Sequence, residues 1–320
     1  MSGSCINPGA MGTMKGDCGK TTSIGRHIAG LVCTALFLLH TMPLWASSVG
    51  VFVSIAPQKY FARKIGGNLI NVSILVPTGA DPHTYEPKPR QMAELSKSEL
   101  YFAVGIDFEK AWLKKIAATH PRMRIIHTDE GIAKIPMTDR HRHEGNNRKH
   151  DKKTQHRDGA ADPHIWLAPG PVKVQAAHIL KALTEADAKN RLLYAAGYDA
   201  FLKELDSLDG ELKALFAGRK GESFMVFHPA WGYFAEAYGL EQVPVEVEGK
   251  EPKPAQLQAL ILHARERGVK VIFVQPQFSV KNAEMVAREI GGAVVRVDPL
   301  AENWDVNMRE VARKFRAVLQ

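Results

Sequence analysis

Short apolar runs alternate with helical stretches along most of this 320-residue chain, and few folds accommodate such an alternation. The runs Val49 to Ile55, Asn71 to Val76 and Tyr101 to Gly105 have the length and composition of buried strands. Parallel strands need long crossover connections, and the intervening helical stretches supply them. The rhythm resumes at Ser223 to Phe227. We therefore expect an α/β protein with two lobes, each a mostly parallel sheet flanked by helices.

The other expected elements follow from the same periodicities. Further strands are expected over 124–127, 269–274 and 293–297, and helices over 57–65, 89–100, 108–118, 231–238, 256–267, 283–290 and 306–319.

A long helical stretch, residues 171–217, separates the two alternating regions. It reads as two helices that meet near Asp187, and in the second helix one apolar stripe runs from Phe201 to Leu215 at steps of four, three, four and three. This pattern predicts a long, rigid spine helix between the lobes. The expected organisation is a leader (1–46), an N-terminal lobe (47–170), a helical linker (171–217) and a C-terminal lobe (218–320).

The N-terminus has the pattern of a secretory signal peptide. Arg26 precedes an apolar stretch over 28–41, and the small residue Ala46 follows it. The stretch is shorter than the roughly 20 residues of a membrane span, although an anchor left in place is the alternative. All three cysteines, at positions 5, 18 and 33, precede Ala46, so the mature chain would contain no disulfide. We expect export to the periplasm.

The net charge of +8 does not indicate nucleic-acid binding. Much of the basic excess lies between Arg140 and Arg157, and aromatic residues are not interleaved with it. The segment 139–158 is nearly devoid of apolar groups, which predicts a mobile loop. Two interpretations of this loop stay open, a low-affinity collector of metal ions and a solvated linker. The collector would use the four histidines of the segment: His141, His143, His150 and His156.

Three histidines beside prolines are the candidate metal ligands. They occur in the phrases Asp-Pro-His83, Asp-Pro-His164 and His228-Pro, and proline makes each phrase a rigid loop start. His83, His228 and Asp298 come after expected strands, and ligands of parallel sheets bind at the carboxyl ends of the strands. Three imidazoles and one carboxylate would give zinc a tetrahedral site. We expect His83, His164, His228 and Asp298 to hold one Zn²⁺ between the lobes.

The phrases Gly-Ala-Asp-Pro-His83-Thr-Tyr-Glu-Pro, Asp-Pro-His164-Ile-Trp-Leu and Phe-His228-Pro-Ala-Trp-Gly-Tyr-Phe-Ala resemble the zinc-binding members of the metal-specific solute-binding proteins of ABC importers. The resemblance extends from Ser48 to Gln320. It implies two α/β lobes joined by a rigid helix, and delivery of the ion to a membrane permease without chemistry. Manganese-binding relatives resemble the pattern but carry a carboxylate where His228 stands. Some zinc members have an acidic residue at the position of Pro82, so Asp298 or a water must complete the ligand set here.

Two other functions remain as alternatives. A zinc hydrolase would use the same histidines with Glu86 or Glu248 as a base, but the chain has no His-Glu-x-x-His motif. A surface adhesin is a further option, because this family resembles proteins so described. For the transport protein we expect a monomer in which Trp231 lines the cleft and limits access of water, whereas Trp166 packs in the core.

Overall fold

The computed structural model describes residue 16 and the ranges 48–137, 161–246, 253–278 and 280–319. The chain divides into two compact units, Met1–Ala46 and Ser47–Gln320, and the described elements all lie in the second. The predictions on the leader with its cysteines, on the histidines of the segment 139–158 and on Glu248 fall outside the described residues. Among the helices that the structure does describe, none combines the length and apolarity of a membrane span.

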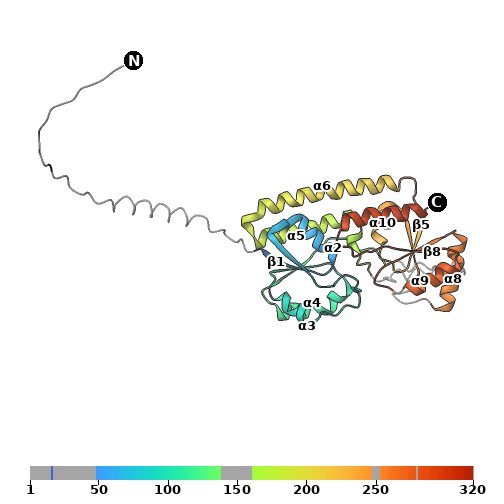
Figure 1. Ribbon diagram of the computed structural model, residues 1–320, viewed down its shortest axis with the longest axis horizontal. Helices are drawn as coiled ribbons and strands as arrows, with labels where there is room; N and C mark the ends of the chain where they lie inside the picture. Colours follow the sequence, from blue (N-terminus) through green and yellow to red (C-terminus); the bar gives the residue numbers. More distant parts are fainter. Residues whose placement is uncertain (1–15, 17–47, 138–160, 247–252, 279, 320) are drawn as a thin grey trace, which may run out of the picture. The chain divides into compact units, whose positions relative to one another are not determined.

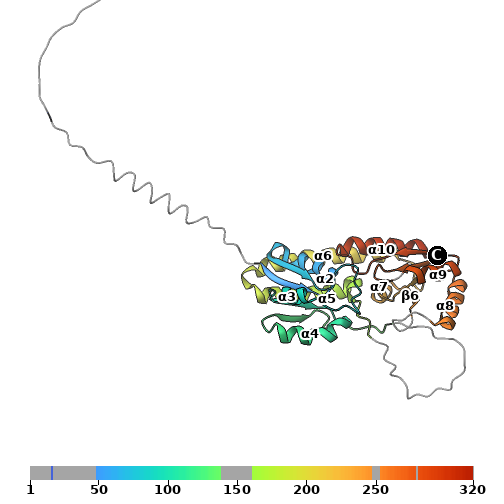
Figure 2. The ribbon, with the colours of Figure 1, turned by 60° about the horizontal axis from the view of Figure 1, so that its bottom comes forward.

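A four-stranded parallel sheet forms the N-terminal half of the second unit. Its strand order is β2-β1-β3-β4, so chain order reverses beside β1. The strands are β1 (Val49–Val53), β2 (Ile70–Ile74), β3 (Leu100–Ala103) and β4 (Arg124–His127). The connecting helices are α2 (Ala56–Gly66), α3 (Pro89–Leu95) and α4 (Asp107–Thr119). Helices α3 and α4 lie on the opposite side of this sheet from α2 (Figure 1, Figure 2).

A second parallel sheet of the same design forms the C-terminal half, with the order β6-β5-β7-β8. Its strands are β5 (Ser223–Val226), β6 (Glu241–Pro244), β7 (Val271–Val274) and β8 (Ala293–Arg296). Its helices are α7 (Gly232–Tyr238), α8 (Pro254–Glu266), α9 (Val280–Glu289) and α10 (Trp304–Val318). Both sheets therefore have a topological switch point, beside β1 and beside β5, where loops can form a binding site.

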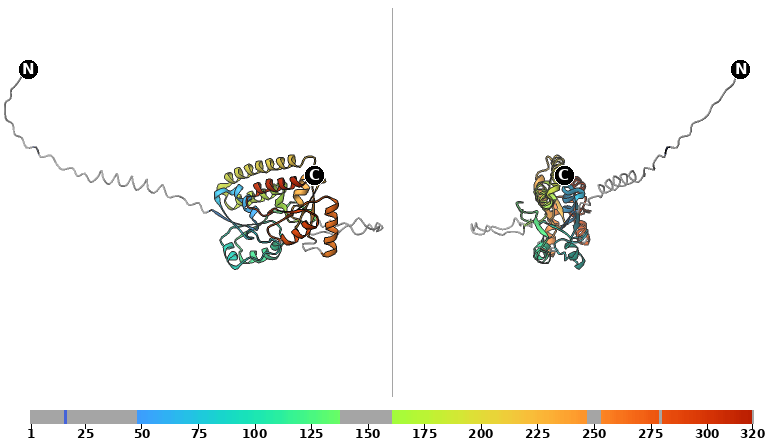
Figure 3. Two further views of the ribbon diagram at one scale, coloured as in Figure 1. Left: turned by 45° about the vertical axis from the view of Figure 1, so that its right-hand side comes forward. Right: turned by 90° about the vertical axis from the view of Figure 1, so that its left-hand side faces the viewer.

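Two helices connect the halves, α5 (Pro169–Ala186) and the 25-residue α6 (Arg191–Leu215). Helix α6 packs against α2 of the first half and α10 of the second, along one side of the molecule (Figure 1, Figure 3). Its stripe of Phe201, Leu205, Leu208 and Leu212 is buried, as the periodicity predicts. Gly197 allows close approach to α2, because a Cβ there would lie 2.5 Å from the carbonyl oxygen of Ile65.

Aromatic side chains from both halves meet beside this helix. Trp304 of α10 contacts Phe61 of α2 edge to face, with ring centroids 5.2 Å apart, and Phe61 stacks on Phe201 of α6. The indole of Trp304 donates a hydrogen bond to the carbonyl oxygen of Trp166, and the Trp166 indole donates one to that of Pro299. One hydrophobic cluster therefore extends through both halves, which limits how they can move against each other, and a second cluster lies within the C-terminal half.

The predicted two-lobe α/β fold is confirmed, with element ends shifted by a few residues. One strand was missed. β6 has the polar sequence Glu-Gln-Val-Pro and lies at the sheet edge, where proline is tolerated because no partner needs its missing N–H. The boundaries proposed for the two lobes and the linker stay predictions.

Candidate metal centre

His83, His164 and His228 lie together in the structure. Each offers one nitrogen atom, and these atoms are all within 4.8 Å of one another. The ring centroids are 5.1 Å apart for His83 and His228, and 5.3 Å apart for the other two pairs. His164 and His228 are buried, whereas His83 is partly exposed. Residues 145 positions apart in the chain therefore form a cluster in which one ion can contact all three rings.

Local backbone geometry explains how the first two histidines are presented. In both Asp-Pro-His phrases the aspartate Oδ1 accepts a hydrogen bond from the histidine backbone N–H, at 2.9 Å from Asp81 to His83 and from Asp162 to His164. This side-chain turn is typical of aspartate and fixes the chain direction before each ring. His228 is the second residue after β5, beside the switch point of the second sheet.

Each of the three rings contacts a carboxylate through its Nδ1 atom. The Nδ1–oxygen distances are 3.1 Å from His83 to Asp107, 2.7 Å from His164 to Asp162 and 2.7 Å from His228 to Glu246. A carboxylate accepts a hydrogen bond from the Nδ1–H group, so the neutral ring keeps its lone pair on Nε2.

The Nε2 atoms are thus the ring atoms with a lone pair available to an ion. His228 Nε2 is buried and has no hydrogen-bond partner among the described residues, which is costly unless something else binds there. Burial lowers the pKa of His164 to about 4, and this exceeds the opposing effect of Asp162. His164 is therefore neutral at physiological pH, the state that binds a metal ion. The hydrogen bond with His83 lowers the pKa of Asp107, so this carboxylate stays ionised.

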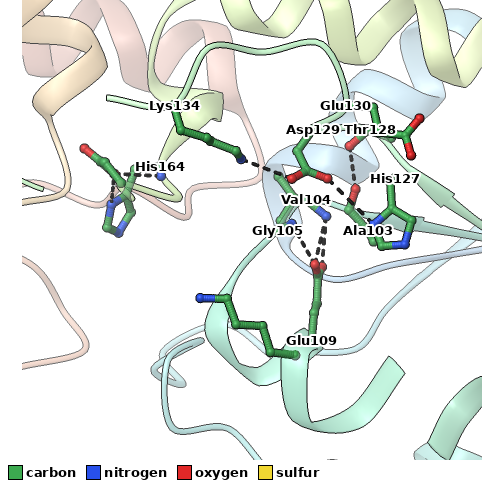
Figure 4. A network of polar contacts seen from close by, with 12 residues as sticks. Ala103, Val104, Gly105, Glu109, His127, Thr128, Asp129, Glu130, Lys134 and His164 are labelled. Carbon is green, nitrogen blue, oxygen red and sulfur yellow. Dashed lines mark hydrogen bonds and ion pairs between the residues drawn. The ribbon is translucent and has the colours of Figure 1, made fainter. Parts of the chain in front are cut away.

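A buried network holds the loop that carries Asp107. The Glu109 carboxylate accepts hydrogen bonds from the backbone N–H groups of Val104 (2.9 Å) and Gly105 (2.6 Å) (Figure 4). It also accepts one from the Ser54 hydroxyl. Burial raises the pKa of Glu109 to about 7. Because α4 begins at Asp107, these bonds fix the turn from which Asp107 reaches His83.

Asp162 also lines a cavity of about 470 Å³, which none of the three histidines lines. Its lining includes Glu109, His127, Asp129 and Lys134, and the Lys134 ammonium lies 3.2 Å from an Asp129 oxygen (Figure 4). Its lining therefore contains both anionic and cationic side chains.

Two aromatic rings cover the cluster. Trp166 contacts His164 with centroids 5.2 Å apart, and Phe278 stacks on His228 at 4.9 Å. Trp166 is fully buried, in keeping with the expected core packing. Trp231, expected to line the cleft, is also fully buried, and its ring contacts Phe234 and Phe315. The aromatic rings that contact the histidines are therefore Trp166 and Phe278, and a role of Trp231 in limiting access of water stays a prediction.

Asp298 and Glu86 are placed differently from the histidines. Among the described residues, the group of ligand atoms within 4.8 Å of one another does not include Asp298. Its Oδ1 accepts hydrogen bonds from the backbone N–H of Leu300 (2.9 Å) and from Gln277 (3.3 Å). Its role as a fourth ligand stays a prediction. Glu86 is exposed, and its predicted place beside the site likewise stays a prediction.

The sequence reasoning missed the supporting carboxylates. Asp162 had a signal, because it stands two residues before His164 in the quoted phrase. Asp107 begins a helix after β3, a position at the same sheet edge as the ligands. Glu246 follows β6, the strand that was not predicted, so nothing in the sequence pointed to it.

Comparison with known proteins agrees with this geometry. Residues 51–317 match the family model ZnuA, the periplasmic component A of the zinc-uptake complex. The chain belongs to this family. A crystal structure of ZnuA superposes with a TM-score of 0.76 at 43% identity, covering 85% of this chain and 99% of that one. A zinc-bound ZnuA that lacks residues 138–173 of its own chain has the same score and identity, and covers 85% of this chain and 98% of that one.

Among curated proteins, the high-affinity zinc uptake system protein ZnuA of Bacillus subtilis (strain 168) is 27% identical over 250 residues, 75% of each chain. The family and the structural relatives are substrate-binding transport proteins and not enzymes, so the prediction of a non-enzyme is confirmed. This chain is accordingly a metal-binding, extracytoplasmic substrate-binding protein of the ZnuA family.

Proposed function

We propose that this protein captures Zn²⁺ outside the cytoplasmic membrane through His83, His164 and His228, and delivers it to an ABC permease. The observation that carries the proposal is the set of three Nε2 atoms, each freed by a carboxylate on Nδ1. Nitrogen donors suit zinc, whereas manganese prefers sites rich in carboxylate oxygen. The names of the ZnuA relatives support the same ion.

The charge of the surroundings also favours a cation. Asp162 and Glu246 are 1% and 5% exposed, and the carboxylate of each contacts one histidine ring of the cluster. Buried charges need compensation, and a divalent ion bonded to Nε2 compensates both carboxylates through the rings. Asp298 or a water would complete the tetrahedral set that zinc prefers. The ion is cargo, so the site binds and releases it without a reaction.

The test is a zinc titration of the mature chain, predicted to begin at Ser47, in competition with a chromophoric chelator. We expect one tight equivalent of zinc, preferred over Mn²⁺, that His164→Ala weakens by at least about 100-fold, or about 2.7 kcal/mol. His178→Ala is the matched control, because this partly exposed ring contacts the carbonyl oxygen of Glu130 and does not belong to the cluster. Equal zinc affinity of His164→Ala and the wild type would contradict the proposal.

Delivery requires a cellular test. A strain without its own zinc-binding transport protein should recover growth in chelator-treated medium when it produces the full chain, and should not recover with His164→Ala. Growth supported equally by both forms would exclude transport through this site.

A further inference from the structure

The hydroxyl of Tyr233 connects the two halves of the protein next to the histidine cluster. It accepts a hydrogen bond from the backbone N–H of Ile135, at 3.3 Å, and donates one to the backbone carbonyl oxygen of Asp162, at 3.1 Å. Tyr233 belongs to α7 of the C-terminal half and is 4% exposed. Burial raises the pKa of Tyr233 to about 12, so the hydroxyl remains a donor at neutral pH.

The two backbone segments that Tyr233 contacts are also joined to each other. Pro136 and Ala161 form an antiparallel bridge, and the Asp162 N–H donates to the Ile135 carbonyl oxygen at 2.9 Å. Both backbone polar groups of Asp162 are therefore bonded, the N–H to Ile135 and the carbonyl to Tyr233. Tyr233 is the part of this arrangement that comes from the other half.

The residue before Tyr233 also constrains Asp162. A Cβ on Gly232 would lie 2.5 Å from Asp162 Oδ2, closer than real Cβ contacts allow. Only glycine lets the carboxylate stay where its Oδ1 can reach both the ring and the backbone of His164. Gly232 and Tyr233 follow His228 by four and five residues. One short segment thus carries one metal ligand and holds the support of another.

We propose that Tyr233 is a positioning residue of the metal site, which sets the place of His164 relative to His228 by holding Asp162 from across the two halves. The inference rests on the proposed function of the three histidines. The 5.3 Å between the rings of His164 and His228 spans the junction of the halves, and the Tyr233 hydroxyl fixes it beside the rings themselves. Rings that are already held close enough to contact one ion lose less conformational freedom when the ion binds.

Tyr233→Phe is the direct test, because it removes the hydroxyl and keeps the ring. We expect zinc affinity to fall about tenfold, within the range found when outer partners of metal ligands are lost. We also expect the visible spectrum of the Co²⁺-loaded protein to change, since this spectrum reports the geometry of the bound ion. Tyr194→Phe is the matched control, because its buried hydroxyl bonds Asp187 and lies on α6. The control should leave both the zinc affinity and the Co²⁺ spectrum as in the wild type.

A double-mutant cycle separates positioning from general stability. If Tyr233 acts through Asp162, its loss should cost clearly less in an Asp162→Asn background than in the wild type. Full additivity of the two losses, or a Tyr233→Phe protein that binds zinc within twofold of the wild type, would overturn the inference. If Tyr233→Phe does not fold, Gly232→Ala takes its place, and a wild-type zinc affinity there would overturn the inference equally.

Gly210→Ala controls for the added methyl group, because a Cβ at this position of α6 meets open space. These outcomes are distinct from a failure of the proposed function. In that case His164→Ala would already bind zinc as tightly as the wild type, whatever Tyr233 does.

Discussion

Replacing Glu246 by glutamine tests whether the carboxylate on Nδ1 prepares His228 for the metal. The two side chains are 6% and 9% exposed and their atoms are 2.7 Å apart, so solvent screens the contact little. A hydrogen bond to a charged group contributes about 1.5–3 kcal/mol. Glutamine can accept only a weaker bond, or can donate to Nδ1 and move the ring proton to Nε2, where the metal should bind.

Taking about 2 kcal/mol as the loss, we expect Glu246→Gln to bind zinc about 30-fold more weakly. Competition with a chromophoric chelator at pH 7.4 measures this, and circular dichroism of the metal-free protein verifies the fold. Glu241→Gln is the matched control, because this exposed residue of β6 bonds Arg267 and not a histidine. A zinc affinity of Glu246→Gln within twofold of the wild type would refute the role assigned to the carboxylate.

The remaining predictions concern Glu109 and Asp298. The pKa of Glu109 is raised from 4.5 to about 7, mainly by burial and slightly by Asp129. Between these two pH values the folded state binds a proton that the unfolded state has lost, so the protein loses stability as the pH rises from 4.5 to 7. In chemical unfolding of the metal-free protein, the free energy of unfolding of Glu109→Gln should therefore rise by about 3 kcal/mol relative to that of the wild type between pH 4.5 and 7. A difference between the two proteins that does not depend on pH would contradict the burial argument. Asp298→Asn should weaken zinc at least tenfold if this carboxylate is the fourth ligand, whereas an unchanged zinc affinity would leave that position to water.

Much of the fold could be predicted because strands and helices alternate with clear periodicity. The apolar stripe on α6 and the short runs of β1 and β5 are local patterns, readable without knowledge of their neighbours. β6 is polar and ends in Pro244, so its position at the edge of the sheet, and not its own composition, makes it a strand. Such a strand is defined by its partner and has no signal of its own.

The three histidines could also be predicted, since each follows or precedes a proline, and His83 and His228 do so after an expected strand. Their supporting carboxylates could not all be found in this way. Asp162 is two residues from its histidine, but Asp107 and Glu246 are 24 and 18 residues from theirs. Asp298 follows β8, which is separated from β5 by β7, so sequence alone cannot say whether it reaches the site.

The most direct measurement is a crystal structure of the mature protein loaded with one equivalent of zinc, with anomalous data collected at the zinc edge. One anomalous peak should lie among His83, His164 and His228, with each Nε2 at about 2.0–2.1 Å from the ion and each Nδ1 still bonded to its carboxylate. A principal peak elsewhere, or an ion that fewer than three of these rings contact, would contradict the account.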